Sequence, residues 1–208
     1  MQLYAEIPWL IEQTRETPNI IDLGWGSGLV ARALGEAGRS VRLVEGSKAA
    51  CNEARQYKGI DAACAMFEDY TPTYAADVVI ASFVLEHVAD PVALLKRCAQ
   101  WAPRLIAVIG NAESWHRRLA VAMGLQPRLD TLSARDEAVG HYCVYDRHSI
   151  AAQLSEAGWR IKSMKGIMLK ALPNSMMTHF DERLIRAMCE ADVEPRDAAN
   201  IAIVAERA

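Results

Sequence analysis

The chain has 208 residues, of which 51% are hydrophobic and 24% are charged, and its formal net charge is −3. This size and balance are typical of one globular domain with its own core, and the slightly acidic charge argues against broad, nonspecific binding to nucleic acid, which needs a basic surface. No apolar run approaches the roughly 20 residues of a membrane helix, so we do not expect a membrane as a partner. From the charge, we do not expect nucleic acid as a partner either.

In the first half of the chain, strand and helix patterns alternate. A helix is expected over residues 3–15, and helices are also expected after Leu29, after Ser47, which suits an N-cap, and from Pro91, which suits a first helical position. Apolar strands are expected at residues 19–23, 41–44, 60–65, 77–82 and 105–109. This alternation predicts a parallel sheet with helices on both faces.

The second half is less regular. Residues 111–145 interrupt the alternation with a helical piece from Ser114 to Met123 and a polar loop through Asp136. Beyond this interruption, we expect a helix at 147–157, a strand at about 159–165 that can extend to 169, a turn at Pro173-Asn174, a helix at about 177–190 and a last strand at 200–205. We therefore treat residues 1–208 as one domain with an insertion at 111–148 and an extra helical segment at 174–190.

The most informative segment is the run from Asn19 to Gly28, which reads Asn-Ile-Ile-Asp-Leu-Gly-Trp-Gly-Ser-Gly. Glycines at alternate positions permit a tight turn and a close approach of the backbone to a ligand, and the N–H groups of the following helix face that ligand. The carboxylate of Asp22, at the end of the strand, would repel a pyrophosphate and attract an ammonium group. A glycine turn combined with an acid predicts a site for S-adenosylmethionine, whose amino acid part carries a positive amine.

A dinucleotide is the alternative ligand. Residues 26–31 also fit the G-x-G-x-x-A form of the dinucleotide-binding fingerprint. Glu45 ends the next apolar strand, where an acid can bind the ribose hydroxyls of either cofactor. An NAD(P)-dependent oxidoreductase is therefore the alternative enzyme, disfavoured because the sequence carries no dehydrogenase substrate domain. A cofactor-binding partner subunit without turnover is the alternative that is not an enzyme.

Two motifs resemble those of a known family. The series Asp22-x-Gly24-x-Gly26-x-Gly28 resembles the first motif, Asp/Glu-x-Gly-x-Gly-x-Gly, of the class I S-adenosylmethionine-dependent methyltransferases. The segment 82–91 contains Leu-Glu-His-Val, which is similar to the segment after the fourth strand in that family. The resemblance implies a single Rossmann-like α/β domain with a seven-stranded, mostly parallel sheet and an antiparallel last strand. It also implies S-adenosylmethionine as methyl donor and S-adenosylhomocysteine as product.

The resemblance also implies a set of cofactor-binding residues, from the glycine turn and from the ends of the second, third and fourth strands. They are Asp22, Gly24, Trp25, Gly26, Ser27, Gly28, Glu45, Gly46, Ser47, Phe67, Glu68, Ser82 and Phe83. Trp25 replaces the small residue usual in the family, and its ring either shields the sulfonium or packs under the turn. Either Glu68 or Asp69 is expected to accept hydrogen bonds from the adenine amino group.

His87 is the candidate catalytic residue. It either takes a proton from the acceptor or only shapes the cofactor site. The insertion at 111–148 is expected to form a lid over a small-molecule acceptor, because loops at this edge of a sheet carry specificity. Its candidate substrate residues are Asn111, Trp115, His116, His141, Tyr142 and Tyr145, with arginines 117, 118, 128 and 135 as further candidates for an acidic acceptor.

Methyl transfer to an oxygen of a small-molecule acceptor is favoured slightly over transfer to nitrogen. The choice of a sugar or secondary-metabolite hydroxyl as that acceptor follows from the family alone. We expect no metal, since Ser82 and Phe83 replace the acids of the family's magnesium site. The five cysteines form no C-x-x-C pair, which favours reduced thiols and a cytoplasmic location. The sequence leaves the identity of the acceptor and the oligomeric state open.

Overall fold

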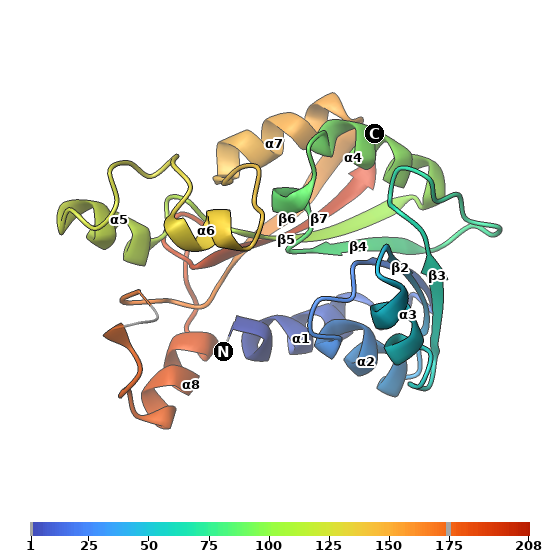
Figure 1. Cartoon of the computed structure of the whole chain (residues 1–208), viewed down its shortest axis with the longest axis horizontal. Coiled ribbons are helices and arrows are strands. Elements are labelled where there is room, and N and C mark those ends of the chain that lie inside the picture. The colour runs from blue at the N-terminus through green and yellow to red at the C-terminus, as the bar shows by residue number, and fades with distance from the viewer. Residues whose placement is uncertain (1, 174–175) are drawn as a thin grey trace.

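The computed structural model describes residues 2–173 and 176–208, which fold around one seven-stranded sheet (Figure 1). The strand order is β3-β2-β1-β4-β5-β7-β6. The strands are β1 (Asn19–Leu23), β2 (Ser40–Glu45), β3 (Ile60–Cys64), β4 (Val78–Ser82), β5 (Arg104–Gly110), β6 (Trp159–Ile167) and β7 (Asn200–Arg207). The first five strands pair in parallel, whereas β7 runs antiparallel to both β5 and β6, which confirms the predicted fold.

Helices cover both faces of the sheet, as the alternating pattern predicts. Figure 1 shows α1 (Gln2–Gln13), α2 (Leu29–Glu36) and α3 (Lys48–Ala54) on one face. The opposite face carries α4 (Pro91–Trp101) and α7 (Arg147–Glu156). The two apolar layers that result sandwich a sheet whose central strands are buried on both sides, as expected for parallel strands.

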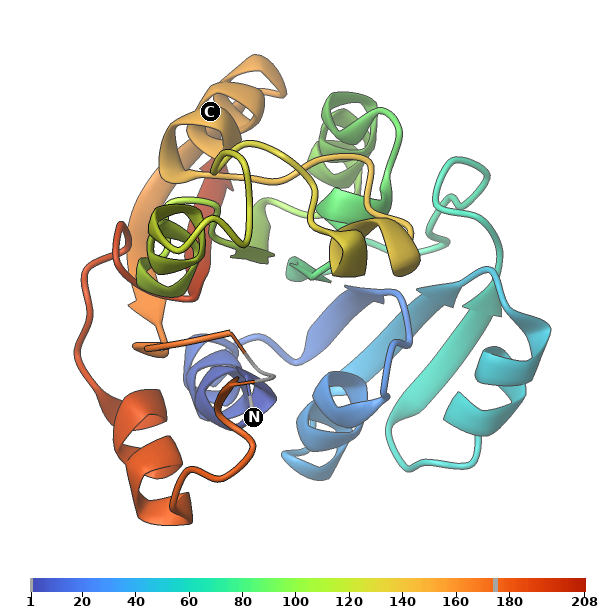
Figure 2. The same ribbon diagram turned by 60° about the vertical axis from the view of Figure 1, so that its left-hand side comes forward.

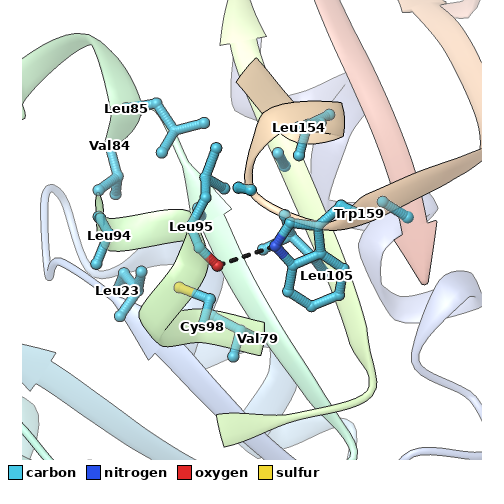
Figure 3. Packing of buried hydrophobic residues seen from close by; sticks show 14 of the residues in the cluster. Leu23, Val79, Val84, Leu85, Leu94, Leu95, Cys98, Leu105, Leu154 and Trp159 are labelled. Atoms are coloured by element: carbon cyan, nitrogen blue, oxygen red, sulfur yellow. Dashed lines mark hydrogen bonds between the residues drawn. The ribbon is translucent and has the colours of Figure 1, made fainter. Parts of the chain in front are cut away.

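The core under α4 and α7 is fixed by directional contacts as well as by apolar packing (Figure 3). The indole Nε1–H of Trp159 donates a hydrogen bond to the backbone oxygen of Leu95 at 2.9 Å. Around this contact, Leu105, Cys98 and Leu154 are buried in one cluster. The polar atom of a buried indole therefore has a partner, and the whole ring contributes to packing.

Local signals at the helix ends also behave as predicted. The hydroxyl of Ser47 accepts a hydrogen bond from Ala50 N at 3.3 Å, and Pro91 occupies the first turn of α4 after the capping carboxylate of Asp90. Each cap satisfies a backbone N–H that has no partner within the helix. These caps fix where the helices that follow β2 and β4 begin.

The second half departs from the prediction in its details. The polar loop expected after α5 (Trp115–Ala122) contains a short helix, α6 (Ala134–Ala138). The helix expected at 177–190 is shorter, as α8 (Glu182–Glu190), and the predicted turn residue Asn174 lies outside the described residues. Figure 1 shows α5 and α6 at the end of the sheet opposite the arrowhead of β7, which is the end where the parallel strands finish.

The cysteines require a correction. Cys51 of α3 and Cys64 at the end of β3 form a disulfide, so the expectation that all the thiols are reduced is wrong. Cys64 pairs with Glu45 in the β2–β3 register, so the disulfide joins α3 to β3 beside the predicted ribose-binding acid. Cys98 is buried and packs as a small hydrophobic residue, as predicted.

Among the residues that the structure describes, no helix combines the length and the apolar character needed to cross a membrane.

Candidate functional site

The winding of the chain reverses between β1 and β4, and sheets of this type have a crevice at that point. β1 lies between β2 and β4; the chain leaves β1 for α2 on one face of the sheet, and it leaves β4 for α4 on the other. In sheets of this type, ligands bind beyond the carboxyl ends of the strands at this position. The segments that follow β1, β2 and β4 therefore form the candidate site.

The glycine turn after β1 has the backbone geometry that its sequence requires. Gly24, Gly26 and Gly28 have φ angles of 80°, 51° and 72°, in the left-handed region that side chains other than glycine disfavour. Gly24 N donates to Val44 O at 2.9 Å, which ties the turn to β2. Gly26 is exposed and a Cβ added to it would meet no atom within 4 Å, so the backbone at this point is open to a ligand.

Trp25 packs beneath this turn. Its side chain is 7% exposed and belongs to the core cluster that contains Leu10 and Leu34. A Cβ added to Gly28 would lie 2.3 Å from Cζ2 of the Trp25 ring, so the glycine allows the ring to pass directly under the backbone. Of the two predicted alternatives, the structure therefore supports packing under the turn, and the Trp25 ring does not face the sulfonium.

Glu45, at the end of β2, is oriented by two backbone donors. Its Oε2 accepts a hydrogen bond from Trp25 N at 2.8 Å, and its Oε1 accepts one from Ser47 N at 2.7 Å. Each carboxylate oxygen can accept a further hydrogen bond, and the residue remains partly exposed. The geometry suits the two hydroxyls of a ribose.

The segment after β3 approaches the same turn. A Cβ added to Gly24 would lie 3.9 Å from Cζ of Phe67, and one added to Gly46 would lie 2.8 Å from Sδ of Met66. The half-buried Phe67 ring therefore reaches the glycine turn. Glu68 and Asp69 are both exposed in the turn that follows, so the choice between them stays open.

A group of buried carboxylates lies behind the glycine turn, and the sequence predicts only one of them. Asp22 is 2% exposed, Glu86 2% and Glu6 of α1 0%. The hydroxyl of Ser82 donates to Oε1 of Glu6, and Gly110 N donates to Oε1 of Glu86 at 2.8 Å. Within the described part of the chain, the second oxygen of Glu6 and that of Glu86 have no hydrogen-bond partner.

Burial and mutual repulsion make these groups weak acids. Loss of solvation on burial raises the pKa of Glu6 to about 7 and that of Glu86 to about 7. Burial, followed by the charge of Glu6, raises the pKa of Asp22 well above its usual range. Glu6 could have been suspected from the sequence, because it lies one helical turn before the buried Leu10 on the same face of α1.

The residues of this crevice fit S-adenosylmethionine. Buried carboxylate oxygens without a partner suit a cation, the open backbone at Gly26 suits the amino acid part, and the oriented Glu45 suits a ribose. The same carboxylates would repel a pyrophosphate, which argues against a dinucleotide. Among the described residues, no cluster of three or more metal-ligating side chains is arranged to hold a metal ion.

The insertion at 111–148 packs against the segment that follows β4. The rings of His87 and His141 meet edge to face, with centroids 4.5 Å apart. Tyr142 N donates to Glu86 O at 2.8 Å, and Nδ1 of His141 lies 3.6 Å from Oδ1 of Asp136 on α6. Figure 2 shows α6 beside the single turn of 3-10 helix at Leu85–His87. The insertion thus lies at the end of the sheet that carries the candidate site.

Two of the predicted substrate residues have structural roles. The side-chain amide of Asn111 donates to backbone oxygens in the segment before β7, including Ala198 O at 2.8 Å. Tyr145 is 1% exposed, and its hydroxyl donates to Oε1 of Gln153 at 3.0 Å. Both side chains therefore hold the insertion to the rest of the domain.

Two of the other aromatic candidates are exposed. Trp115 is 47% exposed and Tyr142 is 66% exposed, and the guanidinium of Arg118 lies 5.2 Å from a ring centroid of Trp115. His116 is half-buried, and burial with the nearby charge of Lys170 lowers its pKa to about 3, so its imidazole is neutral. His141, through its ring, and Tyr142, through its backbone N–H, are the candidates that contact the segment after β4.

The arginines of the insertion contact acids of the chain itself. Arg117 pairs with Asp136 at 3.2 Å, Arg118 pairs with Asp197, and Arg128 pairs with Asp130 at 2.5 Å. The side chain of Arg135 lies outside the described residues. These ion pairs give the positive charges of Arg117, Arg118 and Arg128 partners within the chain, so no acidic acceptor is needed to explain them.

Asn200 is a polar residue at this edge that the sequence does not single out. It is 1% exposed and pairs with Gly110 in the β5–β7 register, at the carboxyl end of β5. Neither its amide nitrogen nor its amide oxygen has a hydrogen-bond partner within the described residues. Only tertiary structure brings this residue close to the Gly110–Glu86 contact.

The chain resembles known methyltransferases in sequence and in fold. A family described as "Methyltransferase domain" matches residues 2–163. The Ubiquinone biosynthesis O-methyltransferase of Bradyrhizobium diazoefficiens is 34% identical over 85 residues, a match that covers 38% of this chain and 34% of that protein. The match thus spans about a third of the length of this curated relative.

Two solved structures extend the likeness to the whole fold. An S-adenosylmethionine-dependent methyltransferase from Mesorhizobium loti has a TM-score of 0.66 and 17% identity, with 98% of each chain covered. Magnesium protoporphyrin IX methyltransferase from Synechocystis PCC 6803, with bound S-adenosylhomocysteine, has a TM-score of 0.67 and 18% identity; the likeness covers 100% of this chain and 83% of that one. At these identities the likeness shows the fold.

Proposed function

We propose that this chain, which belongs to the class I S-adenosylmethionine-dependent methyltransferases, transfers a methyl group to a hydroxyl of a small-molecule acceptor. The observation that carries the proposal is the crevice at β1, β2 and β4, where the glycine turn, the buried Asp22 and the oriented Glu45 lie together. S-Adenosylmethionine, when bound there, supplies a methyl group already activated on a sulfonium.

The residues of the crevice divide the work of binding. Glu45 accepts hydrogen bonds from the ribose hydroxyls, and the amides of the glycine turn and of the start of α2 face the amino acid part. Asp22 provides negative charge for the amine. With the methyl donor fixed, positioning of the acceptor supplies much of the acceleration of an in-line displacement.

A hydroxyl acceptor must lose a proton, and His87 is the group placed to take it. Its side chain is exposed at the mouth of the crevice and packs against His141 of the insertion. Among the described residues, Asn200 and Glu86, which both lie next to Gly110 of β5, have polar atoms without a hydrogen-bond partner, and these suit hydrogen bonds to a polar acceptor. The insertion at 111–148 excludes water from the space between them.

The choice of oxygen over nitrogen has two supports. The segment after β4 begins Ser82-Phe83, and lacks the Asn-Pro-Pro-Tyr motif of enzymes that methylate the amino groups of adenine or glutamine. The curated relative from Bradyrhizobium diazoefficiens is named an O-methyltransferase. A sugar or secondary-metabolite hydroxyl remains the acceptor class that we propose.

Glu45→Ala tests the cofactor site. We expect calorimetry to show that the parent chain binds S-adenosylhomocysteine and that the variant binds it about 1–3 kcal/mol more weakly, because hydrogen bonds to a buried ribose are lost. Glu36→Ala, which removes an exposed acid at the end of α2, should bind like the parent. Equal affinities of the parent and Glu45→Ala would remove Glu45 from the site, whereas binding of NADH in place of S-adenosylhomocysteine would refute the proposed function.

A further inference from the structure

Glu6 is a buried carboxylate without a structural explanation. Helix α1 carries it under the carboxyl edge of the sheet, where its side chain is 0% exposed. Oε1 accepts the hydroxyl of Ser82, but Oε2 has no hydrogen-bond partner among the residues that the structure describes. Burying a carboxylate oxygen without a partner is costly, so a ligand is the natural partner for it.

The groups that face Glu6 come from three elements. Ser82 ends β4, Asp22 lies on β1, and Glu86 lies in the turn after β4. The charge of Glu86 adds to the rise in the pKa of Glu6, and the charge of Glu6 adds to the rise in the pKa of Asp22. Asp22 and Ser82 point to the same face of the sheet as the buried Ile20 and Ile80, which is the face that α1 covers. Glu6, on α1, and Asp22, on the strand beneath it, therefore lie on the same face of the sheet.

We propose that Glu6 and Asp22 together bind the ammonium group of the cofactor's amino acid part, and that this binding is linked to the loss of a proton from Glu6. The proposal rests on the proposed function, because it takes the methionine part of the cofactor as the ligand. An ammonium group has three donors, which can serve the partner-free Oε2 of Glu6 and the carboxylate of Asp22 at once.

The linkage has a definite sign. Burial raises the pKa of Glu6 to about 7, so part of the population carries a proton on this residue at neutral pH in the ligand-free chain. A bound ammonium favours the carboxylate and lowers that pKa. Affinity therefore rises as pH increases through 7, and binding at pH 7 releases a fraction of a proton from Glu6.

The test compares two ligands and three proteins by titration calorimetry. S-Adenosylhomocysteine carries the amino acid part, whereas 5′-methylthioadenosine keeps the nucleoside and the thioether but lacks the amine. Glu6→Gln keeps the shape of the side chain and removes the charge, and Glu12→Gln makes the same change at an exposed position of the same helix. Titrations at pH 7 in two buffers of different ionisation enthalpy report the proton released.

We expect Glu6→Gln to bind S-adenosylhomocysteine about 10- to 100-fold more weakly than the parent, to bind 5′-methylthioadenosine as the parent does, and to release fewer protons than the parent. Glu12→Gln should match the parent in all three measurements. Unchanged affinity of Glu6→Gln for S-adenosylhomocysteine, or an equal loss for both ligands, would overturn the inference. Failure of the parent chain to bind either ligand would instead refute the proposed function.

Discussion

Replacing His87 by alanine is expected to lower turnover by about 10²–10⁴-fold, with the affinity for S-adenosylhomocysteine nearly unchanged. The imidazole is exposed at the mouth of the crevice and rests edge to face on His141, so it can reach the acceptor without contributing to the packed core. Initial rates with S-adenosylmethionine, measured on a hydroxylated acceptor found by screening sugars and phenols, give the turnover.

The matched control is His148→Ala, which removes an exposed histidine of α7 and should leave turnover unchanged. A fall in cofactor affinity in parallel with the rate would show that His87 shapes the cofactor site. Unchanged turnover of His87→Ala would remove it as the base.

Gly28→Ala is expected to destabilise the fold by about 2–5 kcal/mol. Two costs add: a left-handed φ of 72° is unfavourable for alanine by roughly 1–2 kcal/mol, and the new Cβ would lie 2.3 Å from the Trp25 ring, an overpacking that typically costs about 1–3 kcal/mol. The free energy of unfolding, measured in urea, gives the loss.

Gly26→Ala separates these two costs. Gly26 also has a positive φ, 51°, but a Cβ there meets no atom within 4 Å, so only the backbone cost of roughly 1–2 kcal/mol applies. Equal losses for the two variants would contradict the packing of Trp25 under the turn. The comparison of Gly28→Ala with Gly26→Ala thus tests the position of the Trp25 ring under the turn.

Much of the fold can be predicted from local signals. Runs such as Ile20-Ile21 and Val78-Val79-Ile80 are apolar without alternation because their strands are covered on both faces. The caps at Ser47 and Asp90 depend only on neighbouring residues. The glycine turn and Glu45 are also local, since each follows directly from the end of one strand.

The rest depends on contacts between distant segments. Glu6 meets Ser82 across 76 positions, and no pattern near either residue announces that contact. Residue type does not distinguish a pocket wall from a core, which is why Tyr145 and Asn111 were expected at the acceptor and lie in the packed interior. The Cys51–Cys64 disulfide likewise joins two residues 13 positions apart, which the local sequence does not pair.

A crystal structure of the chain with bound S-adenosylhomocysteine tests the central claim most directly. We predict that the ribose hydroxyls contact Glu45, that the amine lies between Asp22 and Glu6, and that the sulfur faces the space between Ser82 and His87 beneath the insertion at 111–148. A ligand bound elsewhere, or an insertion packed away from the sulfur, would contradict the assignment of this crevice as a methyl-transfer site.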